Sequence, residues 1–146
     1  MKLTVDAIEL FLRAVDLHFP TPLSKKQDLH AFALKLFEKA TLCCKFDEGK
    51  ISAMVAGYTD NLDENIAYIS IVATRSEYRG RGYAASLVTD FIEICARKNI
   101  DAVHLYSACS NIAAMNMYRK LGFVEYIAKD EPRPDDAHLI FYVGRK

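Results

Sequence analysis

The chain has 146 residues, of which 51% are hydrophobic, and its 19 basic and 19 acidic side chains give no net charge at pH 7. This length suits one domain with a sizeable core, and we expect residues 1–146 to form it. A chain without net charge lacks the excess of positive charge that is typical of nucleic-acid-binding proteins. No apolar run reaches the roughly 18 residues of a membrane span, and the early Asp6 and Glu9 argue against a signal peptide. We therefore expect neither nucleic acid nor membrane as a partner.

Cysteine and histidine placement argues against a metal centre. The four cysteines are Cys43, Cys44, Cys95 and Cys109, and none forms a C-x-x-C pair. No two histidines stand at the spacing of metal ligands. We expect no metal, and we expect four reduced thiols in a cytoplasmic protein.

Residues 1–40 are predicted to form two amphipathic helices. Thr4 can cap the first, and Pro20 and Pro22 end it. Ser24, with Gln27 three residues later, resembles a capping box for the second. The apolar positions at helical spacing are Ile8, Phe11, Leu12 and Val15, then Leu29, Phe32, Ala33, Leu36, Phe37 and Ala40.

From Thr41 onward the pattern changes to that of strands. The predicted elements are strands 41–46, 51–58 and 66–74, a helix over 84–95, a strand over 101–107, a helix over 111–121 and a hairpin of 123–128 with 138–144. A tight turn joins the first two strands, and Gly122 ends the last helix. The order ααβββαβαββ predicts an α/β domain around one mixed, mostly antiparallel sheet, whose central strand–helix–strand unit is parallel.

The segment "TRSEYRGRGYAASLV" (74–88) places two glycines and flanking arginines where a strand gives way to a helix. A helix that begins near Gly82 leaves its first N–H groups unpaired, and these attract anions. Gly80 and Gly82 lack a Cβ, so a diphosphate can approach the main chain closely. A plain tight turn and the G-x-G-x-x-A dinucleotide fingerprint are alternatives. The fingerprint is disfavoured because the next strand ends in "YSACS", without an acidic residue.

A second motif resolves this choice. Arg79-x-x-Gly82-x-Ala84, followed by Asn111-x-x-Ala114-x-x-x-Tyr118-x-x-x-Gly122-Phe123, resembles the GNAT superfamily of acetyl-CoA-dependent N-acetyltransferases over residues 66 to 126. The resemblance implies the GNAT-like fold, here with a first strand that is missing or very short, and acetyl-CoA as co-substrate. It implies cofactor binding by Val72, Ala73 and Thr74 on the strand, by Arg79, Gly80, Arg81, Gly82, Tyr83 and Ala84, and by Asn111.

The resemblance also implies chemistry. Tyr118 would protonate the departing thiolate, and a main-chain N–H on a splayed strand would hold the oxyanion. Many family members carry a Glu that acts as the general base, either on the strand before the glycines or on the strand after the helix. Residues 68–71 and 105–107 offer no carboxylate there. The general base therefore stays unassigned, with a water chain or an already neutral amine as the alternatives.

The acceptor is the least determined part. The loop "FPTPLS" (19–24) resembles that of some uncharacterised bacterial acetyltransferases. This resemblance favours the primary amine of a small molecule, such as an amino sugar, as the acetyl acceptor. A protein N-terminus or lysine is the alternative, and Asp60, Asp63 and Glu64 would supply an acidic groove for it. A non-catalytic acyl-CoA-binding module is a third hypothesis. The protein is expected to be a monomer or homodimer.

Overall fold

A computed structural model describes residues 3–19, 21–127 and 136–144. The helices are α1 (Val5–Val15), α2 (Leu23–Lys26), α3 (Leu29–Lys39), α4 (Tyr83–Arg97) and α5 (Ile112–Leu121), with short 3-10 helices η1 (Asp16–His18), η2 (Asp63–Asn65) and η3 (Ser76–Tyr78). The strands are β1 (Thr41–Asp47), β2 (Lys50–Tyr58), β3 (Ile66–Thr74), β4 (Ala102–Ala108), β5 (Val124–Glu125) and β6 (Asp136–Tyr142).

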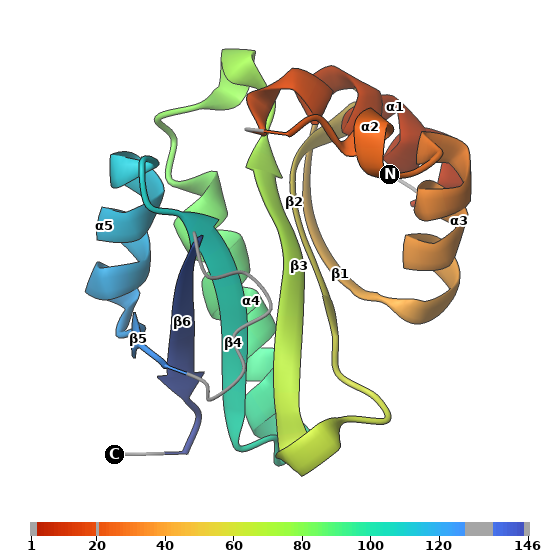
Figure 1. The fold of residues 1–146 in the computed structure, drawn as a ribbon. Coiled ribbons are helices and arrows are strands. Elements are labelled where there is room, and N and C mark those ends of the chain that lie inside the picture. Colours follow the sequence, from red (N-terminus) through yellow and green to blue (C-terminus); the bar gives the residue numbers. More distant parts are fainter. Residues whose placement is uncertain (1–2, 20, 128–135, 145–146) are drawn as a thin grey trace.

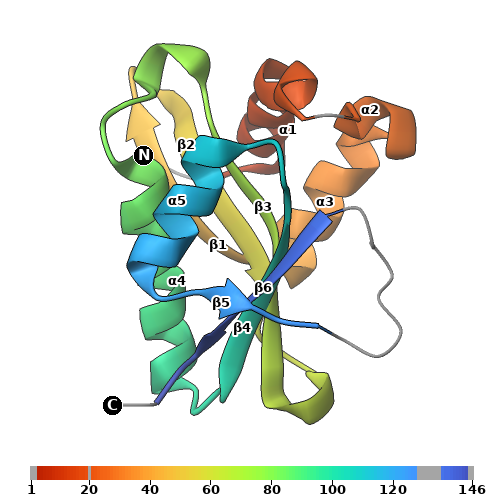
Figure 2. The same cartoon turned by 60° about the vertical axis from the view of Figure 1, so that its left-hand side comes forward.

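The strands form one sheet in the order β1-β2-β3-β4-β6-β5. Among the strands that the structure describes, only the β3–β4 pairing is parallel, and α4 connects these two strands. Helices α1 to α3 cover one face of the sheet, and α4 and α5 cover the other (Figures 1 and 2). The predicted mixed α/β class and its parallel central unit are thus confirmed. Within the described residues, no helix is both long and apolar enough to cross a membrane.

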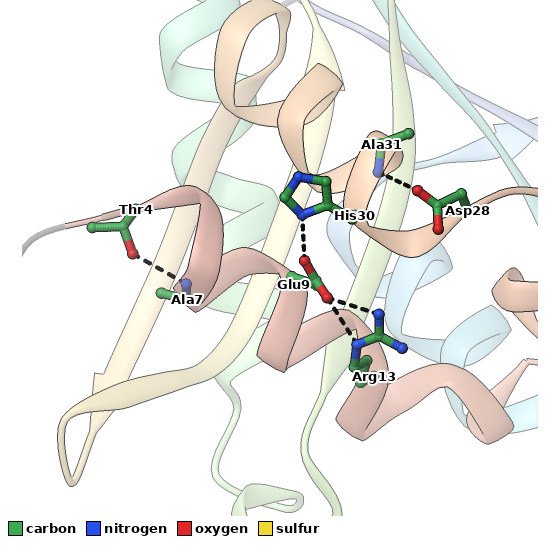
Figure 3. A network of polar contacts seen from close by, with 7 residues as sticks. All are labelled: Thr4, Ala7, Glu9, Arg13, Asp28, His30 and Ala31. Atoms are coloured by element: carbon green, nitrogen blue, oxygen red, sulfur yellow. Dashed lines mark hydrogen bonds and ion pairs between the residues drawn. The ribbon is translucent and has the colours of Figure 1, made fainter.

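The starts of the helices follow local side-chain chemistry, with one difference from the prediction. The Thr4 hydroxyl accepts a hydrogen bond from the Ala7 N–H, as expected for a cap (Figure 3). The predicted Ser24 cap is wrong, because Asp28 caps α3 by accepting from the Ala31 N–H at 3.0 Å. Ser24 instead donates both its N–H and its hydroxyl to the Asp16 carboxylate. That carboxylate thereby fixes the turn between η1 and α2.

A small ionic network joins α1 to α3. Glu9 accepts hydrogen bonds from Arg13 on its own helix, and its other oxygen lies 2.6 Å from Nδ1 of His30 (Figure 3). The Glu9 hydrogen bond raises the pKa of His30 above its ordinary 6.5. In turn, His30 and then Arg13 lower the pKa of Glu9 below its ordinary 4.5.

The His30–Glu9 pair predicts a pH-dependent contribution to stability. A raised histidine pKa stabilises the fold below the histidine's ordinary pKa, and the gain is lost as pH rises through the folded-state value. The lowered pKa of Glu9 gives stability above its own ordinary value that is lost on acidification. We expect His30→Gln to lower the urea midpoint at about pH 5.5 but not well above the folded-state pKa of His30. Arg13→Gln is the control, because the arginine charge does not titrate in this range. Equal losses for His30→Gln at both pH values would contradict the pairing.

A bulge in β3 changes which face its side chains meet. Ala56 on β2 pairs with Ile71, whereas the next residue, Gly57, pairs with Ile69, so Ser70 is the extra residue. Ile69 packs in the core beneath α4, whereas Ile71 packs in the core beneath α1 and α3. One inserted residue therefore reverses the alternation of the strand beyond it.

Gly57, opposite the bulge, permits a close approach of α4. A Cβ at this position would lie 2.6 Å from both the Phe91 ring and the Tyr68 carbonyl oxygen. We expect Gly57→Ala to lower the free energy of unfolding by about 1–3 kcal/mol, because a backbone oxygen cannot move aside cheaply. Urea denaturation measures this loss, and an unchanged midpoint would show that α4 does not sit this close.

Candidate functional site

The main cleft opens where the two parallel strands separate. The β3–β4 pairs run from Ile66↔Ala102 to Tyr68↔His104, directly before the bulge at Ser70. Beyond them β3 stays paired with β2, and β4 with β6. The strands diverge around a cleft of about 670 Å³, which reaches from the bulge to the start of α4. The bulge thus coincides with the opening between the strands.

The glycine segment lies at one end of the main cleft. Gly80 and Gly82 have φ values of +81° and +77°, a left-handed conformation that glycine adopts without steric cost. Gly82 directly precedes α4, and no side chain of the described residues caps this helix, whereas side chains cap α1, α3 and α5. The first N–H groups of α4 are therefore available to an anion from outside the chain.

All but one of the cofactor-binding and catalytic residues that the sequence nominates lie along this cleft. They are Val72, Ala73, Thr74, Arg79, Gly80, Gly82, Tyr83, Ala84, Asn111 and Tyr118. The exception is Arg81, whose guanidinium lies over the Tyr78 ring at 5.0 Å from its centre. Asn111 caps α5 by accepting from the Ala114 N–H at 3.2 Å, as predicted.

Contacts that the sequence does not reveal hold the glycine segment against the β1–β2 hairpin. Arg75 donates from Nε to the Ile51 carbonyl at 2.6 Å, and its main-chain N–H donates to Ser52 at 2.9 Å. The Tyr83 hydroxyl donates to Asp47 at 3.0 Å. Both ends of the segment are thus fixed, which keeps the N–H groups of the α4 start in place. The partners are distant in sequence, so no local pattern signals them.

Tyr118 lies in the wall of the main cleft with its ring nearly fully buried. It is 5% exposed, and its ring packs edge-on against Phe123 at 5.5 Å between centres. Burial raises the pKa of its hydroxyl, since the phenolate would be poorly solvated there. The group therefore stays protonated at neutral pH, the form that a proton donor needs.

His18, the last residue of η1, also lines the main cleft. Its Nε2 is 3.1 Å from the Ser76 hydroxyl, next to the glycine segment. Burial, and then the positive charge of Arg79, lower the pKa of His18. Ser70 and Tyr106 both line the main cleft. No cluster of potential metal ligands occurs among the residues that the structure describes.

A second cavity, the side pocket, has a volume of about 530 Å³. It is lined by Tyr58, Asp60, Asn61, Leu62, Asp63, Glu64, Ile66, Tyr68, His104, Tyr106, Tyr126, His138 and Ile140. Tyr106 lines the main cleft as well, so the two cavities meet at this side chain. The acidic loop that the sequence offers for a peptide acceptor therefore lies beside the main cleft.

Two histidines in the side pocket escape sequence analysis. His104 and His138 lie 34 positions apart, and their Nδ1 and Nε2 atoms share a hydrogen bond of 2.8 Å. The β4–β6 register brings them together, with Tyr106 opposite His138 and the two rings stacked at 4.3 Å. Only the strand pairing reveals this pair, because nothing in the local spacing signals it.

Comparisons with known proteins agree with this geometry. The chain is 39% identical over 57 residues to N-alpha-acetyltransferase 30 of Saccharomyces cerevisiae, covering 39% of this chain and 32% of that protein. It is 32% identical over 80 residues to N-alpha-acetyltransferase MAK3 of Arabidopsis thaliana, covering 54% and 42%. The chain thus matches less than half the length of these relatives.

Solved structures share the whole fold. Ard1 from Thermoplasma volcanium superposes with a TM-score of 0.80 at 18% identity, over 99% of this chain and 97% of that one. PaiA N-acetyltransferase from Thermoplasma acidophilum, solved in complex with coenzyme A, gives 0.74 at 14% identity, over 97% and 96%. The family described as "Acetyltransferase (GNAT) family" matches residues 10–123. Since that match spans most of the 146 residues, the chain belongs to the GNAT family of acetyltransferases.

Proposed function

We propose that this protein transfers the acetyl group of acetyl-CoA to the α-amine at the N-terminus of a polypeptide. The observation that carries the proposal is the similarity of the chain to two proteins named N-alpha-acetyltransferases, at 39% and 32% identity. These relatives favour a protein acceptor over the small amine that the sequence alone favours.

In this proposal the main cleft holds acetyl-CoA. The N–H groups at the start of α4 face the diphosphate, where the helix dipole and the exposed Arg79 add positive potential. The main chain of Val72 to Thr74 binds the pantetheine arm along the edge of β3 that faces away from β2. The thioester then reaches the gap beside the Ser70 bulge, where Tyr118 also lines the cleft.

The chain's own residues supply two parts of the reaction. A main-chain N–H near the bulge stabilises the oxyanion as the amine attacks the acetyl carbon. Tyr118 donates its proton to the sulfur as the C–S bond breaks. The raised pKa keeps this hydroxyl protonated at neutral pH, which is the state that a proton donor requires.

The shape and charge of the side pocket support a peptide acceptor. Asp60, Asp63 and Glu64 line it and would attract a protonated chain end. Of these, Asp60 already pairs with Lys98 at 2.7 Å, which leaves Asp63 and Glu64 for the acceptor. The main cleft adjoins this pocket at Tyr106, so the bound amine and the thioester would meet at the gap between the strands.

Release of the coenzyme A thiol in the presence of different amines tests the proposal. We expect turnover with peptides that carry a free α-amine, and none with the same peptides acetylated at the N-terminus but carrying an internal lysine. Faster turnover with amino sugars or polyamines would instead favour a small-molecule acceptor. Binding of acetyl-CoA without turnover of any amine would indicate a non-catalytic module.

A further inference from the structure

One titratable side chain of the main cleft has no part in the steps above. His18, at the end of η1, lines this cleft together with Arg79, Gly80 and Gly82. Its segment belongs to the N-terminal helices, which cover the face of the sheet opposite α4 (Figure 1). The ring thus brings an ionisable group from a distant part of the chain to the cleft in which the diphosphate is proposed to bind.

A hydrogen bond holds His18 against the glycine segment. Its Nε2 lies 3.1 Å from Oγ of Ser76, the first residue of η3. Arg79 follows three residues later, and the left-handed Gly80 and Gly82 then lead into α4. A serine hydroxyl can donate to a neutral imidazole nitrogen or accept from a protonated one. Ser76 can therefore keep its hydrogen bond in both protonation states of His18.

The charges around the ring favour its neutral form in the protein without ligand. The titratable groups on the elements next to His18 are Asp6, Glu9 and Arg13 on α1, Asp16 on η1, Lys25 and Lys26 on α2, and Glu77, Tyr78 and Arg79 in and after η3. Partial burial, and then the positive charge of Arg79, lower the pKa of His18, and Glu77 opposes them with a smaller effect. Glu77 is itself paired with Lys50 at 3.8 Å.

We propose that His18 takes up a proton when the diphosphate of coenzyme A binds in the main cleft, and that the protonated ring then forms part of the coenzyme site. This inference rests on the proposed function, because that function places acetyl-CoA in the main cleft. It adds a cationic group from the N-terminal helices to a site otherwise built from β3, the glycine segment and α5.

The bound diphosphate would reverse the potential at the ring. Its negative charges would lie beside Arg79 and the first N–H groups of α4, so they would offset the positive charge that disfavours a protonated imidazole. An opposite charge within about 4–6 Å moves a pKa by about 1–3. Since the His18 side chain is exposed, we expect the lower end of this range, a rise of about 1.

This rise has a definite sign in the binding equilibrium. A group whose pKa is higher in the complex binds more protons there, so the affinity for coenzyme A increases as the pH falls. The increase begins near the pKa of the complex and ends below that of the free protein, where the ring is charged in both states. A difference of about 1 between the two pKa values makes the affinity about tenfold higher at the acidic end.

Titration calorimetry in two non-phosphate buffers that differ in ionisation heat gives the number of protons taken up on coenzyme A binding. Wild type, His18→Gln and His30→Gln are compared at the pH midway between the two pKa values of His18. We expect wild type to take up about half a proton more than His18→Gln. The 3′-phosphate of coenzyme A titrates at about pH 6, but this contribution is common to all three proteins and cancels in the difference.

His30→Gln is the matched control. His30 pairs with Glu9 and is not among the described residues that line either cavity, so this variant should take up as many protons as wild type. A loss of uptake in both variants would show that the effect does not belong to the His18 ring, and it would contradict the inference.

An NMR titration of the histidine rings supplies the two pKa values and remains decisive if His18→Gln binds coenzyme A too weakly for calorimetry. The His18 resonance is the one that His18→Gln lacks. We expect its pKa to rise when coenzyme A saturates the wild-type protein, while that of His30 stays the same. Equal proton uptake by wild type and His18→Gln, or an unchanged His18 pKa in the complex, would overturn the inference. Failure of the proposed function looks different, because the wild-type protein would then acetylate no peptide α-amine, whatever its proton uptake.

Discussion

Gly82→Asp is expected to weaken coenzyme A binding by at least about 100-fold. Gly82 directly precedes α4 and lines the main cleft, so its substituent would stand where the diphosphate approaches the N–H groups. Two like charges about 4 Å apart repel by about 4 kcal/mol at an effective dielectric constant of about 20. Because the loop is exposed to solvent, the repulsion is smaller than this value. The expected 100-fold loss of affinity corresponds to about 2.7 kcal/mol. Titration calorimetry with coenzyme A measures the change.

Gly82→Asn separates charge from backbone strain. Gly82 has φ +77°, and a Cβ there would meet no atom of the described part of the chain within 4 Å, so both substitutions carry a similar conformational cost. Asn and Asp both tolerate the left-handed region better than most residues. We expect Gly82→Asn to retain most of the coenzyme A affinity. Equal affinities of the two variants would show that the diphosphate lies elsewhere.

Tyr118→Phe is expected to lower kcat by about 100-fold while leaving acetyl-CoA affinity within about twofold of wild type. The substitution removes only the hydroxyl and keeps the ring against Phe123. Loss of the donor leaves the thiolate to depart unprotonated, which affects the transition state and not the bound substrate. Single-turnover kinetics on a peptide acceptor separates kcat from binding.

Tyr142→Phe provides the comparison for this result. Tyr142 lies on β6 and lines neither cavity, so loss of its hydroxyl should leave kcat unchanged. A Tyr118→Phe enzyme with wild-type kcat would remove the proton-donor role, and the same loss in both variants would point to a general effect on the fold.

Local chemistry explains which features the sequence predicts. Thr4, Asn111 and Gly122 act within one turn of their own helices, so their spacing is sufficient to place the helix ends. Ser24 shows where this fails, because both Ser24 and Asp28 can accept from a helix N–H. The choice between them depends on Asp16, eight residues away, which binds Ser24 instead.

Long-range pairing explains what the sequence does not reveal. The Ser70 bulge exists only relative to the register of β2, and nothing in "IAYISIVAT" distinguishes it from a regular strand. The same holds for His104 and His138, whose contact depends on the β4–β6 register. The motif residues could be nominated from the sequence because each motif lies on one segment. The side pocket could not, because four stretches of the chain that are distant in sequence build it, namely 58–68, 104–106, 126 and 138–140.

A crystal structure of the protein with acetyl-CoA bound tests the central claim most directly, namely that peptide N–H groups around the α4 start hold the diphosphate. We predict phosphate oxygens about 2.7–3.2 Å from main-chain nitrogens within residues 80–84. The acetyl group should then point into the gap beside Ser70. A fully occupied coenzyme bound outside the main cleft, with those N–H groups left to water, would contradict the account.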